Sequence, residues 1–399
     1  MNILVLNAGS SSLKYQVIKM PNETVKCIGL IERIGKDTAV FIHEKDGEKY
    51  TETIPILNHE VGLQKIAATL LDETIGVIKN VDEIEAVGHR VVHGGSKFSK
   101  TIHINKEVKD SIRTLFDLAP LHNPANLTGI EIAETIFTTA KQIAIFDTAF
   151  HQTIPKEAYQ YAIKNSLLEE YKIRAYGFHG TSHKYVSEKA IAYLGEKSSK
   201  KIITIHLGNG CSMSAIKDGK SIENSMGFAP MNGLIMGTRS GDIDPSVIFF
   251  LMKKLNKSAE EVHHLLQKES GMQGLTEYSD LREISEKAEN GNEACKNALN
   301  LAGYRIRKFI GAYAAILNGL DAIIFTAGIG ENSALMRKLA CKNLEFLGIN
   351  LDSEKNTLRS KGTREIQSFT SKVKILIIPT NEEIEIAKQS YKLLNLEIN

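Results

Sequence analysis

The sequence predicts an α/β protein built from two similar halves, and three observations carry this prediction. Strand-like apolar runs alternate with helical patterns along the chain. The N-terminal segment ILVLNAGSSSLKYQV superimposes without a gap on IITIHLGNGCSMSAI, so that Gly9 falls on Gly208, 199 residues later. At 399 residues the chain also exceeds the size at which one hydrophobic core usually keeps growing. We therefore expect a duplicated α/β domain with a cleft between the copies.

The composition is that of an ordinary globular protein, with 42% hydrophobic and 24% charged residues. A net charge of +2 gives no basic surface for nucleic acid. The four cysteines are widely spaced and form no metal-binding pattern, which favours a reducing compartment. The N-terminus has no signal-peptide pattern, and no apolar run could cross a bilayer. These observations predict a cytoplasmic protein that binds neither nucleic acid nor membrane.

Six apolar runs are expected to form strands, and two longer patterns are expected to form helices. A second, weaker likeness relates AIFDTAF (144–150) to IIFTAGI (323–329). The strands cover residues 2–7, 84–95, 142–150, 201–208, 321–328 and 373–380, and the helices cover 124–137 and 294–320.

The loop after the first strand, NAGSSS, resembles a phosphate-binding loop but lacks the second glycine and the Lys-Ser/Thr pair of a P-loop. Beyond it, Leu13, Tyr15 and Val17 alternate with polar residues at a period of two, which predicts a strand rather than a helix. The segment alone favours a plain β-hairpin turn. If the loop binds phosphate, it does so through side chains and hydroxyl groups instead of a helix N-terminus.

Ten blocks spread over the chain resemble the acetate kinase family, within the superfamily of acetate and sugar kinases, Hsp70 and actin. They are VLNAGSSSLKYQV, GHRVVHGG, LAPLHNPAN, FDTAFHQTIP, YGFHGTSHKYV, HLGNGCSMSAI, MGTRSGDIDP, TEYSDLR, FTAGIGENS and IPTNEE. The resemblance implies two RNase H-like (actin-like ATPase) domains, a nucleotide cleft and a homodimer. The expected domains are residues 1–149 with the C-terminal helix 383–399, and residues 150–382, the second binding the nucleotide and forming the dimer.

The resemblance implies reversible, in-line phosphoryl transfer from MgATP to acetate, which gives acetyl phosphate and ADP. A propionate or butyrate kinase of the same family is the alternative within this class of enzyme. A chaperone-like or filament-forming ATPase is the alternative from another class, and it would leave the predicted acyl pocket without a role.

Two anions must meet in such a reaction, and their repulsion at 4 Å is about 4 kcal/mol at an effective dielectric of 20. Arg90 and Arg239 are the candidate cations, although a structural ion pair, for example with Asp242 or Asp244, is the slightly favoured interpretation of each from the sequence alone. The family places Arg90 on the substrate carboxylate and Arg239 on the transferred phosphoryl group.

Histidine is common in the chain, with 12 copies, so most are expected to be structural. The family gives His179 a hydrogen bond to the phosphoryl group in the transition state. His122 and His206 are expected near the site in lesser roles. His93 and His183 are interpreted as structural.

Asp147 ends a predicted strand and could act as a general base, hold Mg²⁺ or orient an arginine. Acetate has a pKa of about 4 and is already ionised at neutral pH, so no base is needed. We therefore expect Asp147 to organise the site through a metal-bound water or an arginine.

The segment PTNEE opens a predicted helix, where glutamates commonly complement the helix dipole. The family instead places Glu382 with Asn7 at Mg²⁺, for which Mn²⁺ can substitute. Such a metal ion keeps water and phosphate ligands.

The family's ATP-binding segments correspond to two glycine turns and a short charged segment, with HLGNG near the phosphates and GIGEN near the adenosine. Lys14 is assigned to ATP, and Ser10 and Ser12 are expected as hydroxyl contacts. The remaining ATP-binding residues are His206, Leu207, Gly208, Asn209, Gly210, Asp280, Leu281, Arg282, Gly328, Ile329, Gly330, Glu331 and Asn332. A helix is expected to begin near Ser333.

The family's acyl pocket corresponds to Val92, Leu121, Phe178 and Pro230. Valine at position 92 narrows the pocket and favours acetate over propionate. One methylene is worth only about 1–3 kcal/mol, so propionate should still react, though less well. Beside this pocket the chain has Met231-Asn232, where relatives have Leu-Glu.

Overall fold

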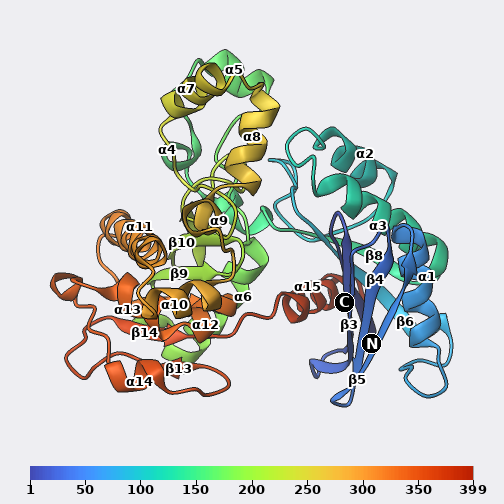
Figure 1. The fold of residues 1–399 in the computed structure, drawn as a ribbon. Coiled ribbons are helices and arrows are strands. Elements are labelled where there is room, and N and C mark those ends of the chain that lie inside the picture. The colour runs from blue at the N-terminus through green and yellow to red at the C-terminus, as the bar shows by residue number, and fades with distance from the viewer. Residues whose placement is uncertain (399) are drawn as a thin grey trace. The chain divides into compact units, whose positions relative to one another are not determined.

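The computed structural model describes residues 1–398, and the chain divides into two compact units. The first unit contains residues 1–150 and the chain from residue 381 onward, and the second contains residues 151–380. Each unit is built on one mixed β-sheet with helices packed against it (Figure 1).

The first unit contains an eight-stranded sheet in the order β5-β4-β3-β2-β1-β6-β8-β7. Strands β1 to β5 pair antiparallel in succession, and β6 and β8 extend the sheet parallel to β1. The strands are β1 (Asn2–Ala8), β2 (Ser12–Lys19), β3 (Thr24–Glu32), β4 (Lys36–Lys45), β5 (Glu48–Ile56), β6 (Ile84–Val91), β7 (Ile102–His103) and β8 (Lys141–Phe146). The helices are α1 (His59–Leu70), α2 (Lys106–Thr114), α3 (Asn123–Ile136) and α15 (Glu382–Ile398).

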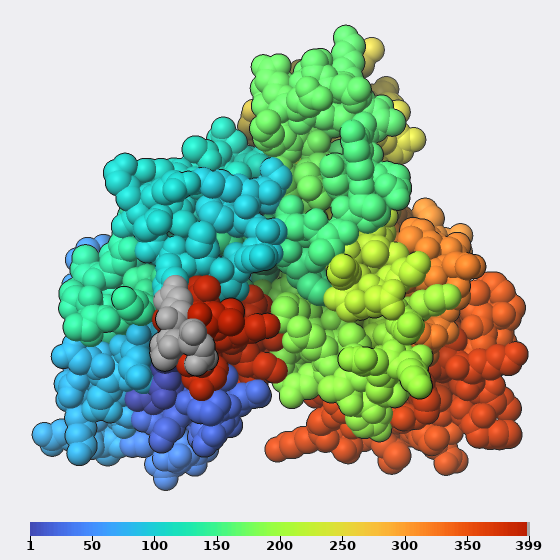
Figure 2. Space-filling view, turned by 180° about the vertical axis from the view of Figure 1, so that it is seen from behind, coloured from blue at the N-terminus to red at the C-terminus, as the bar shows by residue number. Residues whose placement is uncertain are grey.

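The last helix, α15, packs against β1 and β6 although it lies far from them in the sequence. Gly88 of β6 makes this approach possible, because a Cβ there would lie 2.8 Å from Ile386 and Ser390 of α15. Figure 2 shows the red C-terminal segment against the blue and cyan atoms of the first unit. The packing brings the first turn of α15, and with it Glu382, to the sheet.

The second unit contains a six-stranded sheet in the order β11-β10-β9-β12-β14-β13. The strands are β9 (Lys201–Leu207), β10 (Cys211–Lys217), β11 (Lys220–Asn224), β12 (Ala322–Thr326), β13 (Arg364–Glu365) and β14 (Lys374–Ile377). The helices are α4 (Lys156–Tyr159), α5 (Asn165–Glu170), α6 (Gly180–Leu194), α7 (Pro245–Leu255), α8 (Ala259–Lys268), α9 (Gly271–Thr276), α10 (Leu281–Glu289), α11 (Glu293–Leu317), α12 (Ala327–Asn332), α13 (Ala334–Cys341) and α14 (Ser353–Thr357). Within the described chain, no helix is both long and apolar enough to cross a membrane.

Five strands follow the same plan in both sheets: β3-β2-β1-β6-β8 matches β11-β10-β9-β12-β14 in order and direction. The prediction of a duplicated α/β fold is confirmed, as are the two β-hairpins that open the halves. The six predicted strands and both predicted helices are also present.

Two details of the predicted repeat are wrong. Asn7 pairs with Lys14 across the first hairpin, but His206 pairs with Ser212 across the second. The second turn is therefore one residue shorter, and the gap-free superposition fails beyond it. The likeness between 144–150 and 323–329 also fails, because β8 matches β14 and not β12. Buried parallel strands share apolar composition whatever their position in the sheet, and this produced the false match.

The segment GIGEN is part of the short helix α12 rather than a glycine turn. Neither Gly328 nor Gly330 has a positive φ, so both are compatible with a helix. The unusual residue is Ala327, with φ of 65°, a conformation that residues other than glycine rarely adopt. Ser333 then caps α13, as expected.

Candidate active site

In the first unit, three predicted site residues meet around the guanidinium group of a fourth, Arg90. Its Nη2 donates to the carboxylate of Asp147, and its Nη1 lies 3.4 Å from Asn7 Oδ1. Its Nε lies 3.7 Å from Glu382 Oε2. Asn7 and Arg90 belong to neighbouring parallel strands and Asp147 follows the next one, so all three lie at one edge of the sheet.

The electrostatics of this Arg90 cluster follow from its burial. Burial opposes the charge on Arg90, but the carboxylates of Asp147 and Glu382 outweigh that effect and raise the arginine pKa. Burial also raises the pKa of Glu382 to about 7, although Arg90 acts in the opposite direction. With an 18% exposed side chain, Arg90 is a partly accessible, permanently charged cation.

The glycine loop of the first hairpin is held from two sides. Asn126 Nδ2 donates to the carbonyl oxygen of Ala8 at 2.6 Å, and the Val92 N–H donates to Asn126 Oδ1 at 3.0 Å. His59 Nε2 donates to the carbonyl oxygen of Gly9 at 2.7 Å. Lys14 lies opposite Asn7 in the hairpin and is exposed.

Asn126 and Asn123, three residues apart on α3, have roles that the sequence did not indicate. Asn123 binds both the N–H and the carbonyl oxygen of His93, which fixes the backbone of His93. Both asparagines are buried on the inner face of α3. Polar residues three positions apart on the apolar face of a predicted helix were the available signal.

The predicted acyl-pocket residues come from both units. Val92 is buried and Leu121 is exposed, and both belong to the first unit. Phe178 is buried in the second unit, where the carbonyl oxygen of Pro230 accepts from Arg239 Nη1 at 2.6 Å. The acyl pocket itself stays a prediction.

In the second unit, His179, His206 and Arg239 come together beside the turn between β9 and β10. The rings of His179 and His206 stack with their centroids 4.3 Å apart. A Cβ on Gly210 would lie 3.3 Å from His179 Nε2 and 3.8 Å from Arg239 Nη1. Glycine at this position therefore lets an imidazole and a guanidinium approach the same point of the backbone.

Arg239 is not the structural ion pair that its sequence context favoured. Asp242 lies 3.6 Å from Arg305, and Asp244 caps α7. Among the contacts that the described chain provides for Arg239, none is with a carboxylate. Burial lowers the Arg239 pKa from its ordinary value. Arg239 is thus a mostly buried cation without an anionic partner in its own unit.

His179 adopts a left-handed backbone conformation, with φ of 56° and ψ of 28°, immediately before α6. Such a conformation is unfavourable for a residue other than glycine and often marks a functional site. The carbonyl oxygen of His179 accepts from the His183 N–H at 2.9 Å. The first turn of α6 therefore holds the backbone of His179 in place.

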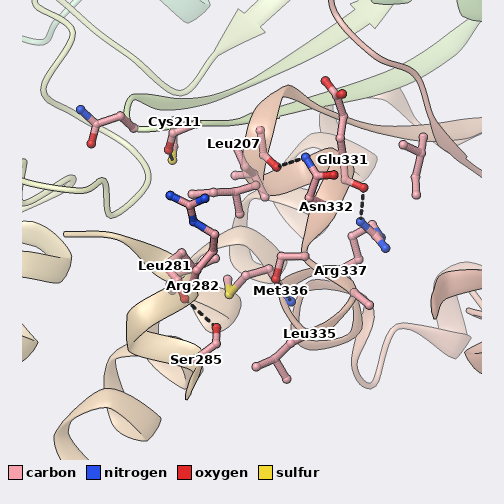
Figure 3. A pocket seen from close by; sticks show the side chains of 18 of the residues that line it. Leu207, Cys211, Leu281, Arg282, Ser285, Glu331, Asn332, Leu335, Met336 and Arg337 are labelled. Carbon is pink, nitrogen blue, oxygen red and sulfur yellow. Dashed lines mark hydrogen bonds between the residues drawn. The ribbon is translucent and has the colours of Figure 1, made fainter. Parts of the chain in front are cut away.

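A pocket of about 1610 Å³ lies in the second unit (Figure 3). The predicted nucleotide residues that line it are Leu207, Gly208, Asn209, Asp280, Leu281, Arg282, Gly328, Ile329, Glu331 and Asn332. His206, Gly210 and Gly330 are not among its lining residues. Residues from all three predicted nucleotide segments, 206–210, 280–282 and 328–332, thus line one pocket.

Arg337 also lines this pocket and was missed from the sequence, where it looks like an ordinary helical cation. It is 1% exposed, and its guanidinium donates to four oxygen atoms. They are the carbonyl oxygens of Gly330, Glu331 and Asn356 and the Oδ1 of Asn356. Burial lowers its pKa to about 10. Arg337 ties α12 to α14 at the pocket wall (Figure 3).

The donor set of the Arg90 cluster is compatible with Mg²⁺, since carboxylate and amide oxygens are the ligands that this ion prefers. Among the described residues, however, no group of three or more His, Cys, Asp or Glu side chains is placed to hold a metal ion. Any ion here would therefore depend on oxygen ligands from water or substrate.

Comparison with known proteins gives a consistent result. A family model described as "Acetokinase family" matches residues 2–388. An acetate kinase of Flavobacterium johnsoniae is 61% identical over 99% of this chain and all of its own length. The crystal structure of Porphyromonas gingivalis acetate kinase matches with a TM-score of 0.93 at 42% identity, covering 98% of this chain and 99% of that one. A propionate kinase structure from Francisella tularensis matches with a TM-score of 0.92 at 41% identity, covering 97% and 98%.

Arg337→Ala should lower the free energy of unfolding by at least about 3 kcal/mol, because each buried acceptor left without a donor costs roughly 1–3 kcal/mol. Urea denaturation measures this change. The matched control is Arg282→Ala in the same pocket, where the arginine is 93% exposed and its solvent-screened ion pair with Asp280 should contribute little to stability. Equal stability losses in the two variants would contradict the structural role of Arg337.

Proposed function

Because the chain belongs to the acetokinase family, we propose that it is an acetate kinase. It transfers the γ-phosphoryl group of ATP to acetate and forms acetyl phosphate and ADP, reversibly. The full-length likeness to an acetate kinase carries this proposal. The Arg90 cluster, Arg239 and the pocket of the second unit supply a chemical basis for it.

In the proposed reaction, a carboxylate oxygen of acetate attacks the γ-phosphorus while the bond from phosphorus to the ADP oxygen breaks. Arg90 binds the acetate carboxylate, and Arg239 stabilises the charge on the transferred phosphoryl group. A planar guanidinium suits both roles because it can donate two parallel hydrogen bonds to an oxyanion. His179 donates an N–H to the phosphoryl group in the transition state.

Asp147 is proposed to hold Arg90 in position rather than to act as a base. Its carboxylate already accepts from the Arg90 guanidinium, and acetate has no proton to remove at neutral pH.

Asn7 and Glu382 are the residues proposed to hold Mg²⁺, for which Mn²⁺ can substitute. Bound to the nucleotide, the ion would neutralise phosphate charge. Lys14 adds a cation beside Glu382 and is assigned to ATP. Ser10 and Ser12 are proposed as hydroxyl contacts, and the pocket of the second unit is proposed to hold the nucleotide. The cytoplasm is the proposed location.

ADP production should depend on acetate, and Arg90→Ala or Arg239→Ala should lower kcat by about 10³ or more, because each arginine stabilises transition-state charge. A coupled ADP assay with and without acetate measures both effects. Arg113→Ala is the control, since Arg113 forms surface ion pairs. Turnover unchanged by acetate would overturn the proposed reaction. Near-normal kcat in both variants would remove these arginines from the mechanism.

A propionate kinase is the second candidate, favoured by the structural match to a propionate kinase. The side chain at position 92 is proposed to discriminate between the two acids. Rates with ATP and acids of two to four carbons separate the candidates, and a preference for a longer acid would contradict the narrow pocket.

Val92→Ala should raise kcat/KM for propionate relative to acetate by about tenfold or more, since one methylene is worth about 1–3 kcal/mol in an apolar pocket. Val87→Ala is the control, because Val87 is buried in β6 outside the predicted pocket. It should lower stability but leave the ratio unchanged. An unchanged ratio in Val92→Ala would place acyl selection elsewhere.

We also propose a homodimer, formed by a second copy at an apolar surface of the second unit. The patch lies on α5, α7 and the segments beside them, which Figures 1 and 2 place at one end of this unit. Its exposed members are Ile163, Leu167, Tyr171, Val247, Phe249, Phe250 and Leu255. A patch of this kind on a soluble protein commonly marks an interface.

Phe249→Glu and Phe250→Glu should each raise the dimer Kd at least about tenfold, because a buried phenylalanine contributes roughly 1.5–3 kcal/mol. Sedimentation equilibrium measures the Kd. Phe369→Glu is the control, since Phe369 is 97% exposed and lies outside the patch. A wild-type monomer, or dimers of unchanged Kd in both variants, would defeat this assignment.

A further inference from the structure

We propose that Thr204, His183 and Ser212 form a directional hydrogen-bond relay that fixes the tautomer of His179. The inference rests on the proposed function, because it gives a purpose to the N–H that His179 presents to the phosphoryl group. The relay residues are positioning residues that act through His179.

The geometry of the relay is continuous. His183 Nδ1 lies 2.7 Å from Thr204 Oγ1, and His183 Nε2 lies 2.7 Å from Ser212 Oγ. Ser212 Oγ also lies 2.9 Å from His179 Nδ1. One serine hydroxyl therefore connects the imidazole of His179, which precedes α6, with that of His183 in the first turn of α6.

Burial keeps the relay dry and His183 neutral. Thr204, His183 and Ser212 have no exposed surface. Burial lowers the pKa of His183 well below its ordinary value, and the neighbouring His151 and His206 add to this effect. A neutral imidazole has one donor nitrogen and one acceptor nitrogen, so His183 must accept at one end and donate at the other.

Thr204 sets the direction of the relay. Within the described chain, the only hydrogen-bond partner of the Thr204 hydroxyl is His183 Nδ1. If His183 donated there, the Thr204 proton would be buried without an acceptor, which is unfavourable. Thr204 therefore donates to His183 Nδ1, and His183 donates from Nε2 to Ser212.

The proton of Ser212 then has one destination. Its oxygen already accepts from His183, so its single O–H donates to His179 Nδ1. A neutral His179 must carry its proton on Nε2. This is the nitrogen that Gly210 leaves room for, next to Arg239. The relay thus presents an N–H donor where the proposed phosphoryl contact needs one.

Other titratable groups surround the relay without belonging to it. His206 stacks on His179, and its Nδ1 forms a hydrogen bond with Ser182 Oγ at 2.8 Å. Ser182 Oγ also forms a hydrogen bond with Thr380 Oγ1. His151 packs edge-on against His183 at 5.7 Å. Arg239 Nη1 would lie 3.8 Å from a Cβ on Gly210. Arg239 contributes a positive charge near His179. None of these surrounding groups forms a hydrogen bond with the Thr204 hydroxyl in the described chain.

Imidazole ¹⁵N shifts of the full-length, histidine-labelled protein test the relay, because protonated and unprotonated ring nitrogens are distinguishable. We expect His179 and His183 each to show one neutral Nε2–H tautomer in the wild type. Thr204→Val keeps the shape of the side chain but removes its hydroxyl, and Ser212→Ala breaks the next link. Both should give His179 a detectable Nδ1–H population and lower kcat about tenfold at unchanged KM for acetate.

Thr204→Ser should restore the wild-type tautomer and kcat, because it returns the hydroxyl. Ser214→Ala is the matched control: Ser214 is buried two residues further along β10 and contacts Ser221 and the carbonyl oxygen of Glu223. It should leave the His179 shifts unchanged.

An Nδ1–H tautomer of His179 in the wild type, or His179 shifts unchanged in both Thr204→Val and Ser212→Ala, would overturn the relay. The wild-type spectrum gives this answer even if a variant fails to fold. It needs no substrate, so a protein without acetate-dependent turnover but with the expected shifts would overturn the proposed function and leave the relay standing.

Discussion

Arg90 lies between the buried carboxylate of Asp147 and the half-buried carboxylate of Glu382, and its positive charge allows negative groups to lie together at the end of the first sheet. The partners come from three other segments: Asn7 in β1, Asp147 after β8 and Glu382 at the start of α15. If Arg90 were lost, the two carboxylates would repel one another in a low-dielectric site. The cluster therefore explains why the chain returns to the first unit for its last helix, and why β6 has a glycine where that helix packs.

The second unit differs from the first in how its buried cations are bound. It holds cations and imidazoles with few anionic partners: Arg239 donates to a carbonyl oxygen, and Arg337 donates only to neutral oxygens. Charges of this kind are unfavourable when buried unless every donor is satisfied. Four hydrogen bonds offset this cost for Arg337, whereas the positive charge of Arg239 is left without an anion in the described unit and suits a polyanionic ligand such as a nucleotide.

Much of the fold could be predicted from the sequence because strand patterns and glycine turns are local signals. The strands, the hairpins and the duplicated fold followed from periodicity and repetition. The roles of Asn126 and Arg337 did not, because they depend on partners elsewhere in the chain, Ala8 and Asn356. The relay was also invisible: His183 looked structural, since nothing in FHGTSHKYV indicates that Ser212 and Thr204 lie against it. Sequence patterns indicate where strands and helices lie. Hydrogen bonds between segments that are distant in the sequence can be identified only once the fold is known.

The duplication also explains how one hairpin plan supports two kinds of chemistry. In the first hairpin Lys14 lies opposite Asn7, whereas in the second Ser212 lies opposite His206. The shorter second turn thus puts a small, buried hydroxyl at the position equivalent to an exposed lysine. A long cation there would need solvent or an anion, but a serine can be buried beneath His179 and connect it to His183. The two hairpins therefore use the equivalent position differently: it is a charged, solvent-facing lysine in the first and an internal link between two histidines in the second.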